Sequence, residues 1–173
     1  MKVFKFGGAS VKDAVGVKNL SSIIHQQHGQ LIVVVSAMGK TTNLLETLCN
    51  AYFHQDPKAT AIMKELKNFH LDIVNTLFPL NAPVYKHLEE LFTNLENILT
   101  SESSLCYDYE YDRIICFGEL ISTTIISDYL KMEGIENQFI DIRKFLKTDQ
   151  NYRNANIDLE LSEQLCKETF DFK

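Results

Sequence analysis

Residues with chemical potential gather where two short apolar runs end. Residues 3–6 form the first run, which contains Lys5 and is followed directly by Gly7 and Gly8. Paired glycines let the backbone approach a ligand closely, and a lysine beside them supplies positive charge for an anion. Ser10 can cap a following helix, whose N-terminus would favour an anion at the same place. The pattern predicts either a phosphate cradle or a tight turn with a surface lysine.

The second run, residues 31–35, ends in the segment SAMGKTTN at residues 36–43. Gly39-Lys40-Thr41 suggests a P-loop, but that motif needs a further glycine where this chain has Val34. The hydroxyls of Ser36 and Thr42 fit a turn and a helix start, where they could bind a phosphate or a carboxylate. Simple helix capping is the alternative, and it is compatible with binding.

Glu119 is the only charged residue in the segment IICFGELISTTIIS, residues 114–127. Apolar residues fall on nearly every face of this predicted helix, so we expect the helix, and the carboxylate with it, to be buried. A buried carboxylate without a partner would cost several kcal/mol. Its partner is either a Lys or Arg of this chain or the ammonium group of a ligand, and Gly118 leaves room for close approach.

Three other groups of polar residues have simpler interpretations. Arg143 follows a third predicted strand and could clamp a ligand carboxylate or pair with Asp141. A run of acidic residues reads as a solvated helix entry: Asp108, Glu110 and Asp112. The four cysteines and five histidines show no metal-ligand spacing, so no metal site built from the protein alone is expected.

Composition excludes several classes of protein. The 173 residues are 45% hydrophobic and 23% charged, as in a globular domain. The net charge is −6 and the basic residues are scattered, which disfavours nucleic acid as a partner. No apolar run is long enough for a membrane span, and the first residues are too short and polar for a signal peptide. We therefore expect a cytoplasmic protein without a membrane partner.

The predicted elements alternate between strands and helices. Strands are expected at residues 3–6, 31–35 and 138–140, and the second reads as a central parallel strand covered on both faces. Helices are expected, with breaks at Pro57, Pro79 and Pro83, at about 11–28, 42–54, 58–77, 84–99, 111–131 and 158–170, and the polar, acidic residues 101–109 are expected to be a loop. This order predicts an α/β fold, an open and mainly parallel sheet with helices on both faces. The few strands suggest that the sheet is incomplete in this chain.

Four segments together resemble aspartokinase, a member of the amino acid kinase family. They are KFGGAS, VVVSAMGKTTNLL, DRIICFGELIS and FIDIRKFLKTDQNY, in the family's order and spacing. The resemblance runs from residue 1 to about residue 158. It implies that residues 1–173 are the N-terminal portion of an amino acid kinase domain, without the nucleotide-binding half and the regulatory ACT domains.

The implied reaction is ATP-dependent phosphorylation of the side-chain carboxylate of L-aspartate to 4-phospho-L-aspartate. This reaction opens the bacterial and plant route to lysine, threonine and methionine. By resemblance, Lys5 is catalytic and lies with Gly7, Gly8 and Ser10 around the phosphates of ATP, with Mg²⁺ bound to the nucleotide. Aspartate would be held by three residues: Ser36, Thr42 and Glu119.

The chain departs from the family pattern in two respects. Ala9 replaces the family's usual threonine, and the glycine-rich segment that completes the aspartate and phosphate sites does not follow. We therefore expect the isolated chain to be an inactive fragment. A half-built sheet leaves an unpaired strand edge and an uncovered apolar face, which predict self-association, as in a homo-oligomer, or marginal stability. The alternative is a non-catalytic α/β module that binds a small amino acid or serves in assembly. A generic dinucleotide-binding enzyme is disfavoured, because the spaced glycines of GxGxxG are missing.

Overall fold

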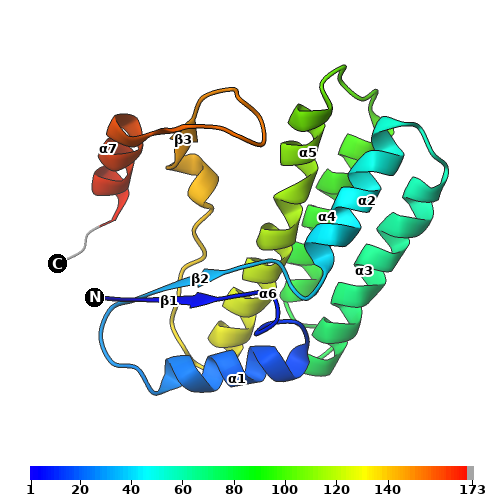
Figure 1. The fold of residues 1–173 in the computed structure, drawn as a ribbon. Coiled ribbons are helices and arrows are strands. Elements are labelled where there is room, and N and C mark those ends of the chain that lie inside the picture. Colours follow the sequence, from blue (N-terminus) through cyan, green and yellow to red (C-terminus); the bar gives the residue numbers. More distant parts are fainter. Residues whose placement is uncertain (171–173) are drawn as a thin grey trace.

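The computed structural model describes residues 1–170 of the chain. Two parallel strands lie beside a group of long helices, and a small C-terminal unit stands apart from them (Figure 1). The strands are β1 (Lys2–Phe6) and β2 (Leu31–Val35), and α1 (Ala14–His25) connects them. A helical crossover of this kind is what parallel pairing requires.

The helix α1 starts three residues later than a cap at Ser10 would require. Asp13 is the N-cap, and its carboxylate accepts a hydrogen bond of 2.8 Å from the backbone N–H of Gly16. Ser10 instead belongs to a turn in which its N–H donates to the carbonyl of Gly7 at 2.9 Å. The prediction that Ser10 caps the helix is therefore wrong, because the chain makes one more turn before the helix begins.

The two faces of the strand pair differ in their surroundings. Phe6, Leu31, Val33 and Val35 pack against the buried core. Residues on the opposite face are open to solvent, and Val34 is 46% exposed. Residues 31–35 were expected to be covered on both faces, but the described part of the chain covers only one of them.

The core beside the sheet contains three long helices, α2 (Thr41–Phe53), α3 (Lys58–Leu77) and α4 (Val84–Thr100), together with residues of α1 and of a later buried helix. They lie within a residue of their predicted ends. Pro57 and Pro83 directly precede α3 and α4, where a fixed φ and a missing N–H suit a helix start. The core is built from side chains that are almost fully buried: Leu20, Leu45, Leu48, Leu66, Leu88, Phe92, Ile121 and Ile125.

The single helix expected at residues 111–131 is two helices. These are α5 (Tyr107–Ile115) and α6 (Phe117–Met132), separated at Cys116. The prediction missed the first helical turn because residues 101–109 are polar and acidic, although acidic side chains suit a helix N-terminus. Cys116 keeps helical backbone angles (φ −59°, ψ −18°), so the interruption is a local change of hydrogen bonding.

Residues 138–140, expected as a third strand, have no regular secondary structure. A strand needs a ladder partner, and the described part of the chain forms its parallel ladder only between β1 and β2. The chain continues into a small C-terminal unit with four elements: η1 (Ile142–Lys144), β3 (Lys147–Thr148), β4 (Ile157–Asp158) and α7 (Leu159–Thr169). The predicted helix at residues 158–170 is therefore confirmed as α7.

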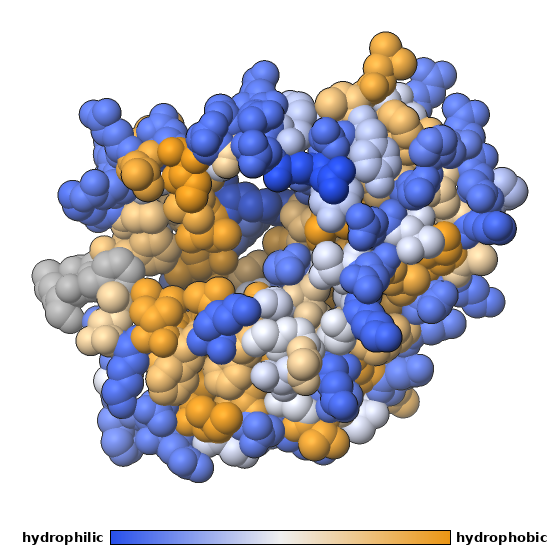
Figure 2. All heavy atoms as spheres, viewed as in Figure 1, coloured by the Kyte–Doolittle hydropathy of each residue, from blue (hydrophilic) through white to orange (hydrophobic). Residues whose placement is uncertain are grey.

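The C-terminal unit contacts the helices through Arg153, through the ring of Tyr152 against that of Tyr109, and through Arg143 at Cys116. Arg153 donates to Asp108 at 3.1 Å, and its guanidinium lies 4.3 Å from the ring centroid of Tyr111. A hollow separates much of this unit from the rest of the molecule (Figure 2). The unit also exposes apolar side chains: Ile142, Leu146, Ile157, Leu159 and Leu161. Among the described helices, none has the length and apolar character of a membrane span.

Candidate functional site

The loops that follow β1 and β2 are joined through their backbones. The N–H of Gly39 donates to the carbonyl of Gly8 at 3.1 Å, and the N–H of Ser36 donates to that of Phe6 at 3.0 Å. A Cβ on Gly8 would lie 2.6 Å from the carbonyl oxygen of Ala37, a distance that side chains do not tolerate. Glycine at position 8 therefore permits the close contact between the two loops.

Lys5, Gly7, Gly8 and Ser10 lie together around the first loop. Lys5 is exposed, and its ammonium nitrogen is 3.8 Å from where a Cβ on Gly7 would be. The positive charge thus stands directly over the glycine turn. This arrangement of a cation above an open backbone suits an anion, while the turn itself needs no ligand.

Glu119 lies on the first turn of α6 and reaches the second loop. One of its carboxylate oxygens accepts a hydrogen bond of 3.2 Å from the N–H of Ala37. The helix α6 is buried as expected, but the side chain of Glu119 is exposed. The prediction of a buried carboxylate is wrong, because the first turn of α6 lies at the open edge of the sheet, where the side chain of Glu119 is not covered. Glu119 therefore needs no internal cation and presents its charge to solvent beside the loop.

The space expected beside Gly118 is filled by protein. A Cβ at this position would lie 2.8 Å from the Cβ of Ala37 and 3.2 Å from a methyl group of Leu45. Gly118 therefore lets α6 pack closely against the loop and α2. It holds Glu119 near the loop and leaves no room for a ligand at its own position.

Ser36 and Thr42 stand at the two ends of the second loop. The carbonyl of Ser36 accepts a hydrogen bond of 2.8 Å from the hydroxyl of Ser122, three residues after Glu119 on α6. Thr42 is exposed on the first turn of α2, next to Lys40 at its N-cap. The structure thus brings Ser36, Thr42 and Glu119 to the same edge as Lys5.

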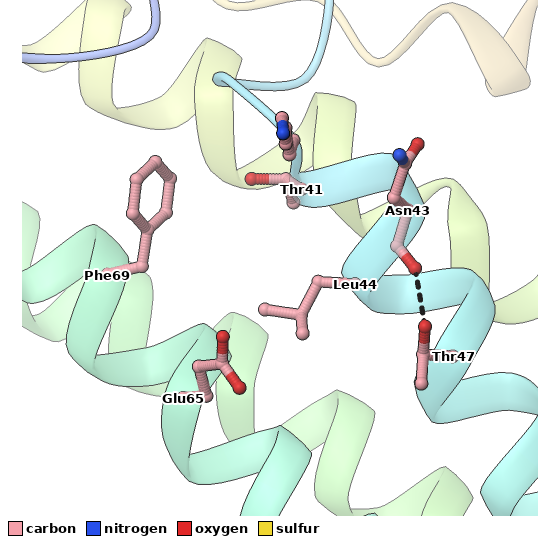
Figure 3. A pocket seen from close by; sticks show the side chains of 7 residues that line it. Thr41, Asn43, Leu44, Thr47, Glu65 and Phe69 are labelled. Carbon is pink, nitrogen blue, oxygen red and sulfur yellow. Dashed lines mark hydrogen bonds between the residues drawn. The ribbon is translucent and has the colours of Figure 1, made fainter.

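A cavity of about 300 Å³ opens beside the start of α2, between α2 and α3 (Figure 3). The side chains of Thr41, Leu44, Glu65 and Phe69 point into it. Lys40, Asn43 and Thr47 complete its lining. The cavity borders the second loop, and its walls combine two opposite charges with an apolar floor.

Arg143 pairs with Asp141, which was one of its two predicted roles. Its guanidinium donates to both carboxylate oxygens, at 2.9 and 2.7 Å, and to the sulfur of Cys116 at 3.2 Å. The bidentate pair holds the pKa of Asp141 below its usual value and raises that of Arg143. Burial raises the pKa of the Cys116 thiol, so this sulfur is a poor nucleophile at neutral pH.

Glu110 is fully buried, although it was predicted to be part of a solvated helix entry. One carboxylate oxygen accepts a hydrogen bond of 2.7 Å from the N–H of Ser104, and the other lies 3.5 Å from the guanidinium of Arg113. The prediction is wrong because the carboxylate folds back over the preceding loop. The buried acid of this chain thus fastens α5 and takes no part in the loops beside the sheet.

Two residues near the loops were missed in the sequence. The sequence pattern marks Lys40 only as part of an incomplete P-loop, and it does not mark Ser122. The three-residue spacing from Glu119 to Ser122 places both on one helix face, which is the signal that could have identified Ser122. Within residues 1–170 no cluster of three or more His, Cys, Asp or Glu side chains could hold a metal ion.

A sequence comparison decides the family. The model of the amino acid kinase family matches residues 1–171. The chain belongs to the amino acid kinase family. Curated relatives include the aspartokinase of Chlamydia pneumoniae, 28% identical over 92% of this chain and 34% of its own length. Aspartokinase 2, chloroplastic, of Arabidopsis thaliana is 31% identical over 90% of this chain and 29% of its length.

Solved structures of this family share the fold. Aspartokinase III of Escherichia coli, solved with aspartate and ADP, matches at a TM-score of 0.86, with 24% identity over 98% of this chain and 37% of that chain. The aspartate kinase of Clostridium acetobutylicum matches at 0.73, with 27% identity over 98% of this chain and 36% of that chain. The expected α/β fold with a parallel sheet, partial in this chain, is confirmed. The chain spans about a third of the length of these amino acid kinases.

Proposed function

We propose that this chain forms the aspartate-binding and phosphoryl-facing part of an aspartokinase. The whole enzyme would transfer a phosphoryl group from ATP to the side-chain carboxylate of L-aspartate, giving 4-phospho-L-aspartate. The observation that carries the proposal is that one pair of joined loops has a cation on one side and a carboxylate on the other. The loop after β1, which Lys5 precedes, shares backbone hydrogen bonds with residues 36–39, and Glu119 of α6 accepts from Ala37 in that second loop. One of these groups suits an anion and the other an ammonium group.

The inventory of residues fits this chemistry. An aspartate side chain has a pKa of about 3.9, so its carboxylate is already ionised at neutral pH and needs no general base. The difficulty is the repulsion between a carboxylate and a triphosphate. Lys5 and the backbone N–H groups near Gly7 and Gly8 would offset the negative charge that builds up on the phosphoryl group during its transfer.

The second loop would hold aspartate itself. The hydroxyls of Ser36 and Thr42 are available to a carboxylate at the start of α2, where the helix N-terminus favours an anion. The carboxylate of Glu119 would pair with the α-ammonium group while its other oxygen stays on Ala37. Mg²⁺ would come with the nucleotide, bound by its phosphates, because the described residues hold no acidic cluster for it.

The isolated chain is proposed to bind aspartate but not to phosphorylate it, since the chain spans about a third of the length of the aspartokinases that it resembles. A cytoplasmic location, a homo-oligomer and a place at the start of lysine, threonine and methionine synthesis belong to the same proposal. The alternative is a non-catalytic module that binds a small amino acid or serves in assembly. The observation that favours this alternative is the tight contact at Gly8, where a Cβ would lie 2.6 Å from the carbonyl oxygen of Ala37, because packing alone then accounts for the glycine turn.

Two ligands that differ only in the ammonium group test the role of Glu119. We expect NMR titration with L-aspartate to shift the amide signals of residues 36–42, and succinate to bind more weakly. Glu119→Gln should remove most of the preference for aspartate, about fivefold for an exposed charge pair of about 1 kcal/mol. Glu133→Gln, which makes the same change at the other end of α6, should keep the preference.

Trapping with hydroxylamine tests the reaction. The chain is incubated with Mg-ATP and either aspartate or glutamate, and acyl phosphate is measured as the hydroxamate. We expect no product from the chain alone. Hydroxamate from aspartate but not glutamate would show that the chain is catalytically complete. Failure of aspartate to shift residues 36–42, or equal loss of preference in Glu133→Gln, would contradict the proposed aspartate site.

A further inference from the structure

A buried histidine lies beneath the start of α2. His70, on α3, is 0% exposed and contacts the rings of Phe69 and Phe92. Its Nδ1 is 2.8 Å from the carbonyl oxygen of Leu66, which can only accept a hydrogen bond. The proton therefore resides on Nδ1, and Nε2 is left as an acceptor.

Thr41 supplies the donor for that nitrogen. Its hydroxyl lies 3.3 Å from Nε2 of His70, and the threonine is 2% exposed. With the imidazole in the Nδ1–H tautomer, the hydroxyl donates and both ring nitrogens have partners. A buried pair that is fully partnered in only one tautomer fixes both side chains in one orientation.

Thr41 is also the point where the second loop becomes a helix. Its backbone N–H donates to the carbonyl of Met38 at 3.0 Å, and Thr42 is the next residue. Its methyl group lies 3.5 Å from where a Cβ on Gly118 would be. A shift of the backbone at Thr41 would therefore move Thr42 and the N-terminus of α2 together.

The neighbour of His70 supports the other end of the same turn. A ring carbon of Phe69 lies 3.4 Å from where a Cβ on Gly39 would be, and Gly39 has a positive φ of +54°. Phe69 also stands in the wall of the cavity beside Thr41 (Figure 3). Two consecutive residues of α3 thus pack under residues 39 and 41.

We propose that His70 is a positioning residue for the loop of residues 36–42. Its neutral imidazole accepts the hydrogen bond from the hydroxyl of Thr41 and holds that side chain in place. In this way His70 sets where Lys40 and Thr42 stand at the open edge of the sheet. The consequence for aspartate rests on the proposed function. The consequence for the loop does not.

Amide hydrogen exchange in the 173-residue chain tests the effect on the loop. Thr41→Val removes the donor at constant shape, and His70→Leu removes the acceptor. Each should speed exchange of the amides of Gly39 and Thr41, whose N–H groups donate to Gly8 and Met38, by about threefold to tenfold, the range expected for one hydrogen bond. The double variant should exceed the single ones little, because both remove the same bond.

Two matched controls separate positioning from general loosening of α3. Thr41→Ser keeps the hydroxyl and should stay near the unmodified chain. Ile73→Val removes a methyl group from the same helix without touching the loop, and should leave residues 39–42 unchanged. Equal exchange in Thr41→Val and Thr41→Ser, or in His70→Leu and Ile73→Val, would overturn the proposal. So would an NMR spectrum that places the imidazole proton on Nε2.

Aspartate titration of the same variants separates this inference from the proposed function. If the loop binds aspartate, Thr41→Val should weaken binding by about the factor by which exchange increases. If the unmodified chain does not bind aspartate, the proposed function fails, and hydrogen exchange alone still decides whether His70 positions the loop.

Discussion

Acid should destabilise this chain through His70 before most of its carboxylates are protonated. Burial lowers the pKa of His70 from 6.5 to about 4. The unfolded chain therefore binds a proton at this residue between pH 6.5 and 4, while the folded chain does not. The free energy of unfolding is highest above pH 6.5, falls as the pH drops through this window and is fully reduced below about pH 4. At 1.36 kcal/mol per pH unit, the loss is about 3 kcal/mol.

Urea unfolding from pH 7.5 to 4 measures this loss when the chain is compared with His70→Gln. Glutamine does not titrate, so carboxylates and the other histidines contribute equally to both proteins. Because the described contacts of His70 are with Thr41, Leu66, Phe69 and Phe92, no ionisable side chain among them confuses the comparison. The difference in stability between the two proteins should shrink with acid by about 1.4 kcal/mol per pH unit.

Two results would refute this reasoning. One is a constant difference in the free energy of unfolding across the whole pH range. The other is an NMR titration in which the imidazole of His70 ionises near pH 6.5 in the folded chain, since that would mean that water reaches the ring. Either result would remove the physical basis for a His70 that stays neutral and accepts the hydrogen bond of Thr41.

Three further substitutions test the packing around the loops and the C-terminal unit. Gly118→Ala would place a Cβ 2.8 Å from that of Ala37 and should cost about 1–3 kcal/mol, seen as a lower Tm; an unchanged Tm would contradict the close packing of α6. Glu110→Gln should cost about 1–3 kcal/mol in urea unfolding, because Gln loses the charge facing Arg113 in a buried site; a neutral effect would mean that the carboxylate is hydrated. Arg153→Met should speed proteolysis within residues 142–169 while leaving the Tm of the helices unchanged, and equal loosening throughout would show that the C-terminal unit is integral to the core.

The long helices were predictable because their limits are set by local chemistry. Pro57 and Pro83 fix the starts of α3 and α4, and the apolar period fixes their buried faces. The strand predicted at residues 138–140 is not formed, and the sequence could not show this. Phe139 and Ile140, one aromatic and one β-branched, favour an extended backbone, but a ladder also needs a neighbouring strand, and propensity does not show whether one is present.

The places of the candidate residues in the fold were easier to predict than their surroundings. Sequence order alone placed Lys5 and Ser36 at strand ends, which share one edge of a parallel sheet. For Glu110 and Glu119 the predicted and the observed burial are opposite, because burial depends on which elements pack against a helix. Glu119 lies in an apolar helix but at its open end, whereas Glu110 lies in an acidic run but under a loop. The pairing of His70 with Thr41 joins residues 29 positions apart, and no local pattern signals it.

The hydrogen bond from Gly39 to Gly8 has a consequence for how this site tolerates change. Since both atoms belong to the backbone, no side-chain replacement removes the bond itself, and only proline at position 39 would delete its donor. What replacement can disturb is the spacing, because a Cβ at position 8 would collide with the carbonyl of Ala37. Divergence of the surrounding side chains is therefore compatible with a fixed distance between the two loops, provided that position 8 stays without a side chain.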